Sequence, residues 1–151
     1  MDTIVLPTFE RQLEIILPVA VAELDLHHFK RINDTQGHLY GDEILKEMAI
    51  LVKGCLRTMD VLARYGGEEF AILLPETDLE DAVQTAERIR MAVENHDFPA
   101  PKGKKVNVTV SQGVTSFPSP GVQKRSDIVA KADEALYEAK EAGRNCVRSR
   151  E

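Results

Sequence analysis

A tight chain reversal between two apolar runs is the feature that most constrains the fold of this chain. Residues 61–63 precede the reversal and residues 70–74 follow it, so the two runs predict short buried strands joined by a hairpin. Gly66 and Gly67 supply the positive φ that primed hairpin turns need, and they let a ligand approach the backbone closely. The reversal therefore predicts antiparallel strands with room for a ligand at the turn.

Two adjacent carboxylates, Glu68 and Glu69, complete this RYGGEEF segment. Neighbouring strand residues point to opposite faces, so one carboxylate can hold a divalent cation while the other faces a different partner. A solvated hairpin with an acidic tip explains the seven residues about as well. The buried run 19–26 favours the metal, because it carries Asp25 just before a polar, basic turn typical of phosphate sites on α/β scaffolds. The alternative for Asp25 is a simple charge at a strand end.

The composition fits one soluble domain. A chain of 151 residues with 43% hydrophobic content can bury a single core. Its net charge of -6 repels polyanions, which disfavours general binding of nucleic acids. Cys55 and Cys146 are typical of reduced packing residues in a cytoplasmic protein. The apolar run 15–22 contains Pro18 and is shorter than the ~20 residues that span a bilayer, so we expect no membrane segment or signal peptide.

Helical spacing of apolar residues predicts three amphipathic helices, at residues 41–57, 77–95 and 126–143. Thr77 with Glu80 is typical of a capping box, Ser126 of an N-cap, and Gly143 of a helix end. Between the second and third helices, residues 99–105 predict a loop.

Alternating apolar residues predict a half-buried strand at 106–113, and residues 145–147 predict an edge strand. Together with the hairpin, these elements indicate an α+β domain of mostly antiparallel strands with helices packed on the sheet.

Four segments together resemble the GGDEF family of diguanylate cyclases. They are LDLHHFKRINDTQGHLYGDE (24–43), ARYGGEEF (63–70), NVTVSQGVTSFP (107–118) and KADEALYEAKEAGRN (131–145). Their order and separations match the family, and the resemblance covers residues 19–147. It implies a fold like that of nucleotidyl cyclases and polymerase palms, with a central, mostly antiparallel five-stranded sheet surrounded by helices. Residues 1–151 would form one such domain, with an abbreviated N-terminal lead-in at 1–18 that lacks the family's Thr-Gly and Asn-Arg.

The resemblance implies condensation of two GTP molecules into cyclic di-GMP and two pyrophosphates. Each subunit of a homodimer would hold one GTP, with Mg²⁺ as the cofactor and Mn²⁺ as the alternative ion. A sensory or receiver domain outside this chain would supply the upstream input. A catalytically weak domain that senses cyclic di-GMP or GTP is the alternative function. A cyclase with relaxed base choice is a third possibility, which Asp42 disfavours.

The resemblance also assigns site residues. The side chains of Asp25 and Glu68 and the carbonyl of Leu26 match the metal ligands. Glu69 matches the group that receives the hydroxyl proton or supports a second metal, and Lys30 the group that stabilises phosphate charge. The substrate-binding positions are His28, Phe29, Lys30, Asn33, Asp42, Gly67, Lys140 and Arg144. Without the resemblance, a solvated basic face would explain Lys140 and Arg144 better.

An RxxD pattern, Arg57 and Asp60, precedes the hairpin and matches the family's inhibitory site for the product. Arg88 matches the position from which a neighbouring subunit completes that site. A helix-end ion pair explains the bare pattern about as well. The main departure is His27, which stands where the family usually has a second aspartate.

Overall fold

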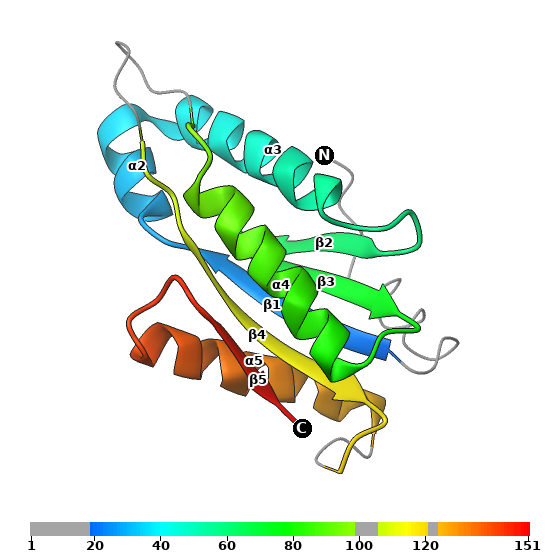
Figure 1. Cartoon of the computed structure of the whole chain (residues 1–151). Coiled ribbons are helices and arrows are strands. Elements are labelled where there is room, and N and C mark those ends of the chain that lie inside the picture. Colours follow the sequence, from blue (N-terminus) through cyan, green and yellow to red (C-terminus); the bar gives the residue numbers. More distant parts are fainter. Residues whose placement is uncertain (1–18, 99–105, 121–123) are drawn as a thin grey trace.

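One five-stranded sheet organises the described part of the chain. The computed structural model describes residues 19–98, 106–120 and 124–151 (Figure 1). Its strands are β1 (Val19–Leu26), β2 (Val61–Gly66), β3 (Glu69–Pro75), β4 (Val110–Phe117) and β5 (Val147–Arg150). They lie in the order β2-β3-β1-β4-β5, and only the β4–β5 pair is parallel. The predicted five-stranded, mostly antiparallel sheet is confirmed.

Helices cover both faces of this sheet (Figure 1). They are α2 (Phe29–Gln36), α3 (His38–Gly54), α4 (Leu79–Glu94) and α5 (Arg125–Glu141). Alternate residues of β1 serve the two faces: Leu24 packs in the cluster with α3 and α4, whereas Val21 packs with Ile128 of α5. β1 is buried along its whole length, because it lies in the middle of the sheet.

Helix α5 approaches β4 very closely at Gly113. A Cβ added at Gly113 would lie 2.1 Å from the backbone nitrogen of Leu136 and 2.2 Å from the carbonyl oxygen of Ala132. Glycine is therefore required for this contact, which fixes the C-terminal half of α5 over the centre of the sheet.

The structure corrects the reading of the segment after β1 as a turn. Residues 29–36 form helix α2, with Phe29 and Ile32 buried one turn apart. Gly37, with φ of 92°, separates this helix from α3. Helix α3 consequently begins at His38 and ends at Gly54, instead of spanning 41–57.

Both predicted N-caps are wrong. Asp78 caps α4 by accepting a hydrogen bond from the Asp81 N–H, while the Thr77 hydroxyl donates to the Pro75 carbonyl. At α5 the Asp127 carboxylate accepts from the Lys124 N–H at 3.1 Å, and Ser126 lies inside the first turn. In each case the aspartate, an anionic acceptor, makes the stronger bond at the positive end of the helix.

The strand predicted at 106–113 is shifted in the structure. Val106 makes only an isolated bridge with Phe98, whereas β4 begins at Val110 and continues to Phe117. The expected edge strand is present as β5, but it begins only at Val147. The predicted loop at 99–105 and the lead-in at 1–18 lie outside the described residues. Among the described helices, none combines the length and the apolar character needed to cross a membrane.

Candidate functional site

The β2–β3 turn presents an open backbone, as its sequence predicts. Gly66 and Gly67 have φ of 146° and 51°, and no atom lies within 4 Å of a Cβ added at either position. The Arg64 guanidinium donates to the Gly67 carbonyl at 2.9 and 3.1 Å, which holds the turn in shape. A ligand can therefore reach the main chain of Gly67 without meeting a side chain at the glycines.

The end of β1 lies directly beside this turn. Asp25 pairs with Glu69 in the antiparallel register, and the Leu26 N–H donates to the Glu68 carbonyl at 3.1 Å. Directly opposed residues project from the same face of the sheet, so the Asp25 and Glu69 carboxylates share the face that α5 covers. The structure thus brings together the three acidic positions that the sequence selected.

Asp25 combines burial with an unused oxygen. Its side chain is 10% exposed, and its Oδ2 forms an ion pair with Lys140 Nζ at 2.5 Å. Oδ1 is buried and has no hydrogen-bond partner among the described residues. A buried carboxylate oxygen without a donor is costly unless a ligand satisfies it.

The donors at this edge suit a hard divalent cation. Asp25 Oδ1, the Glu68 carboxylate and the Leu26 carbonyl would supply three oxygens, which is the chemistry that Mg²⁺ and Mn²⁺ prefer. Within the described ranges, no three His, Cys, Asp or Glu side chains are placed to hold a metal by themselves. Two carboxylates and a carbonyl leave the remaining positions to water or to substrate oxygens, as Mg²⁺ sites commonly do.

Two basic residues converge on the same strand end. Lys140 reaches Asp25 from α5, and Arg144 follows Gly143 in the turn after the helix. Burial lowers the pKa of His27 to about 4; Asp25 opposes this decrease, whereas Arg144 and Lys140 add to it. Both cationic groups therefore lie near the end of β1, where a polyphosphate could meet them.

His27 is buried and neutral. Its Nε2 forms a hydrogen bond with the Ser111 hydroxyl at 2.5 Å, across to β4. His27 therefore contributes no charge to the metal edge near neutral pH.

Helix α2 begins immediately after this edge. His28 occupies its N-cap with φ of 68°, Phe29 is buried, and Lys30 is exposed in the first turn. The free N–H groups of a helix N-terminus and a nearby lysine form a favourable environment for an anion. The predicted triphosphate residues are thus placed on a helix start and not on a turn.

Asn33 lies against Gly41, the residue before Asp42, where α2 contacts α3. A Cβ at Gly41 would lie 1.8 Å from Asn33 Oδ1, so this glycine allows the two helices to approach. Asn33 Oδ1 is buried without a partner in the described part of the chain, and the next residue, Asp42, is exposed. Sequence reasoning did not select Gly41, although its position beside Asp42 in the GD pair was a usable signal.

A buried acid was also missed. Glu23 lies two residues before Asp25 on the same face of β1 and is only 6% exposed. It lines a hollow of about 130 Å³ together with Glu69 and Asp133. Burial raises the pKa of Asp133, and the charge of Lys140 opposes this increase. The period-two alternation of β1 could have identified Glu23 as a residue on the Asp25 face.

Arg57 and Asp60 form a closed pair. Arg57 Nη2 lies 2.9 Å from Asp60 Oδ1, and it also donates to the Pro75 carbonyl and the Thr77 hydroxyl. Hydrogen bonding to Asp60 raises the pKa of Arg57. The Arg57 side chain is nevertheless half exposed, whereas that of Asp60 is 2% exposed. Both residues line a hollow of about 340 Å³.

Arg88 lies apart from this hollow. It is an exposed residue of α4 and does not line the hollow beside Arg57. Burial raises the pKa of Cys55 near the end of α3, and the charge of Arg88 opposes this increase, so Arg88 lies near that end of α3.

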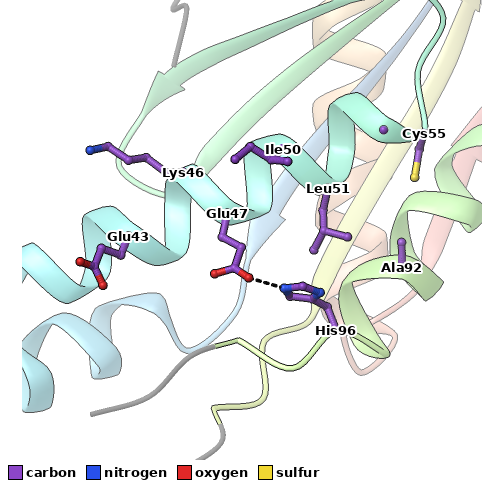
Figure 2. A pocket seen from close by; sticks show the side chains of 9 residues that line it. Glu43, Lys46, Glu47, Ile50, Leu51, Cys55, Ala92 and His96 are labelled. Atoms are coloured by element: carbon purple, nitrogen blue, oxygen red, sulfur yellow. Dashed lines mark hydrogen bonds and ion pairs between the residues drawn. The ribbon is translucent and has the colours of Figure 1, made fainter.

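A larger hollow of about 800 Å³ lies between α3 and α4 (Figure 2). Ile50 and Leu51 of α3 line it with Ala92 of α4, and the Glu47–His96 contact of 2.6 Å joins α3 to the residues just after α4. None of the predicted substrate or metal residues lines this hollow.

Comparisons with known proteins agree with this geometry. The model of the family described as "Diguanylate cyclase, GGDEF domain" matches residues 5–146. The chain is 46% identical over 129 residues to "Diguanylate cyclase A" of Treponema denticola, covering 85% of this chain and 34% of that protein. It thus spans about a third of the length of that curated relative.

Two solved structures have the same fold. One is the active GGEEF domain of a diguanylate cyclase from Vibrio cholerae, with a TM-score of 0.82, 34% identity, and coverage of 96% of this chain and 91% of that one. The other is the GGDEF domain of DgcB from Caulobacter crescentus in complex with c-di-GMP, with a TM-score of 0.80, 34% identity, and coverage of 87% and 77%. This chain belongs to the GGDEF family, as shown by the family match, by the shared fold and by the GGEEF turn that lies beside Asp25 at the end of β1.

Proposed function

We propose that this domain is a diguanylate cyclase, which condenses two GTP molecules into cyclic di-GMP and two pyrophosphates. The observation that carries the proposal is the meeting of Asp25, the GGEEF turn and two cationic side chains at one strand end. Relatives named diguanylate cyclases, with 42–46% identity in this region, support the same activity. Cytoplasmic location and control by a sensory or receiver domain belong to the same proposal.

In this proposal, Asp25, Glu68 and the Leu26 carbonyl would hold Mg²⁺ or Mn²⁺, and the bound ion would neutralise charge on the triphosphate and lower the pKa of the attacking hydroxyl. The start of α2, with Lys30, binds the phosphates nearest the sheet. Lys140 and Arg144 bind the terminal phosphates by charge-assisted hydrogen bonds.

The guanine base would lie between α2 and α3. The Asp42 carboxylate can accept two N–H groups from the N1 and N2 edge of guanine, an edge that adenine lacks. The unpartnered Oδ1 of Asn33 offers a further acceptor beside it. The substrate would also contact the main chain of Gly67, which is the last of the predicted substrate-binding residues.

The reaction needs two copies of the domain. The 3′-oxygen of one GTP attacks the α-phosphorus of the other, the bond from that phosphorus to the pyrophosphate oxygen breaks, and Glu69 receives the hydroxyl proton. A second, equivalent step closes the ring. Because each copy binds one GTP, a homodimer aligns the two nucleotides.

The proposal is tested by incubating the protein with GTP and Mg²⁺ and identifying the product by mass spectrometry. We expect cyclic di-GMP, and a loss of at least about 100-fold in rate for Glu69→Gln, because general base catalysis contributes that much. Glu80→Gln, an exposed change on the first turn of α4, is the matched control and should retain full activity. Absence of product even after forced dimerisation would contradict the proposal.

Product binding at Arg57 and Asp60 is a further part of the proposal, supported by their shared hollow and by the half-exposed Arg57 side chain. Arg88 of a second copy would complete this site. Calorimetry should show cyclic di-GMP binding that Arg57→Ala abolishes and that Arg148→Ala, an exposed change on β5, leaves intact. Tight product binding without any synthesis would instead support the sensing function.

A further inference from the structure

The turn between α5 and β5 is held in an unusual backbone conformation. Gly143, Arg144 and Asn145 have φ of 109°, 65° and 46°, so three consecutive residues lie in the left-handed region. Glycine and asparagine adopt this region readily, whereas an arginine there is strained. Surrounding contacts must therefore hold Arg144 in place.

Those contacts come largely through the side chain of Asn145. Its Nδ2 donates to Glu94 Oε1 at 3.0 Å, and its Oδ1 accepts from Arg90 Nη1 at 3.3 Å. Arg90 also donates to Glu94 at 2.8 Å and to Glu87 at 3.1 Å, and its side chain is only 17% exposed. The Asn145 amide is thus joined to a three-residue network at the end of α4, about 50 residues away in sequence.

Backbone bonds lead from this network to Arg144. The Arg144 N–H donates to the Ala139 carbonyl at 3.0 Å, and the Cys146 carbonyl accepts from the Gln112 N–H of β4 at 3.0 Å. Arg144 therefore lies between backbone bonds to the end of α5 on one side and to β4 on the other. Its positive charge helps to lower the pKa of His27 at the end of β1, so the guanidinium lies within electrostatic reach of the candidate phosphate site.

We propose that Asn145 is a positioning residue for Arg144. By joining the turn to Arg90 and Glu94 of α4, its amide keeps the left-handed conformation that directs the Arg144 guanidinium toward the terminal phosphates of GTP. This inference rests on the proposed function, because it assumes that Arg144 binds those phosphates.

The side chain, and not only the backbone preference of asparagine, is required by this proposal. Asn145→Gly retains easy access to positive φ but loses both bonds, so it should weaken binding of the triphosphate much as Asn145→Ala does. Glu94→Ala removes the acceptor for Asn145 and should weaken binding of the triphosphate. Glu94→Gln keeps an oxygen that can accept from Asn145, so this variant should bind the triphosphate more tightly than Glu94→Ala does.

The test is a double-mutant cycle on binding to the intact chain, measured by calorimetry with Mg²⁺ and a GTP analogue whose α–β bridge resists cleavage. Asn145→Ala should weaken affinity about threefold to tenfold, as expected for lost hydrogen bonds and a displaced guanidinium. In an Arg144→Ala background the same change should have no further effect. Affinity for GMP, which lacks the terminal phosphates, should not change.

A matched control is Asn95→Ala, which removes the same amide from the residue that caps the end of α4. It should leave triphosphate affinity unchanged, and thermal melts of all variants monitor folding. Equal losses for GTP analogue and GMP, or additive effects of Asn145→Ala and Arg144→Ala, would overturn the positioning role. If Arg144→Ala alone has no effect, the phosphate role in the proposed function is wrong, and the positioning inference is wrong with it.

Discussion

His27 illustrates how a single residue can alter the balance of charge at this site. It replaces an aspartate that the family usually carries, and burial keeps its imidazole neutral beside the carboxylate of Asp25. Through its hydrogen bond to Ser111, His27 also links the end of β1 to β4. At this position the chain has exchanged a charge for a buried hydrogen bond.

This exchange predicts an acid-sensitive fold. The pKa of His27 is about 4 in the folded chain, below its ordinary value of 6.5, so unfolding takes up a proton between these pH values. The stabilising contribution is therefore complete above about pH 6.5 and decreases as the pH falls toward 4, by roughly 3 kcal/mol in total.

Urea unfolding at pH 7.5 and pH 4.5 measures this effect. His27→Gln should lose less stability than the wild type on acidification, because glutamine does not titrate. His38→Gln, which changes an exposed histidine at the start of α3, should retain the wild-type dependence. An identical pH dependence for His27→Gln and the wild type would contradict the prediction.

At the scale of elements, the contact between α5 and β4 places the cationic residues. Gly113 allows α5 to lie against the sheet, and Lys140 then reaches Asp25 from the last turn of the helix. The atoms that a Cβ at Gly113 would meet belong to the backbone of α5, so they cannot rotate away. Helix position, and not side-chain choice alone, sets the geometry of the site.

Gly113→Ala should therefore destabilise the fold by about 3 kcal/mol or more, since overpacking a rigid core contact costs this much. Gly54→Ala is the matched control, because Gly54 ends α3 with open space around it and alanine favours a helix. Chemical unfolding should show a large loss for the first variant and little loss, or a small gain, for the second. Equal stability of the two variants would show that α5 can move away from β4 at little cost.

For the whole molecule, the two candidate sites lie at opposite ends of the sheet. Asp25 pairs with Glu69 at one end of β1, whereas Val19 pairs with Pro75 at the other, and Arg57 bonds to the Pro75 carbonyl. Val19 and Asp25 are six positions apart along β1, a separation of roughly 20 Å. A product molecule bound at Arg57 would consequently inhibit the reaction from a site distant from the candidate metal and phosphate site at Asp25.

The proposed need for two copies predicts that the specific activity depends on protein concentration. If one chain aligns only one GTP, as proposed, specific activity should rise with protein concentration, and fusion to a dimeric coiled coil should remove that dependence. The effect is measured from initial rates across a dilution series, and analytical sedimentation of the same samples measures dimerisation. Constant specific activity of a monomer would be the contrary result.

The sequence predicted the hairpin, the place of Glu68 and Glu69 beside its turn, and the chain order of the strands and of the helices other than α2, because turn residues and hydrophobic periods are local properties. Helix α2 and the cap at Asp78 were not predicted, since competing local signals differ there by little free energy. The ion pair of Lys140 with Asp25, the burial of Glu23 and the bridge from Asn145 to α4 join residues more than 40 positions apart, or depend on strand neighbours. Only tertiary packing decides such contacts, because it determines which distant side chains share a face and which of them lose their water.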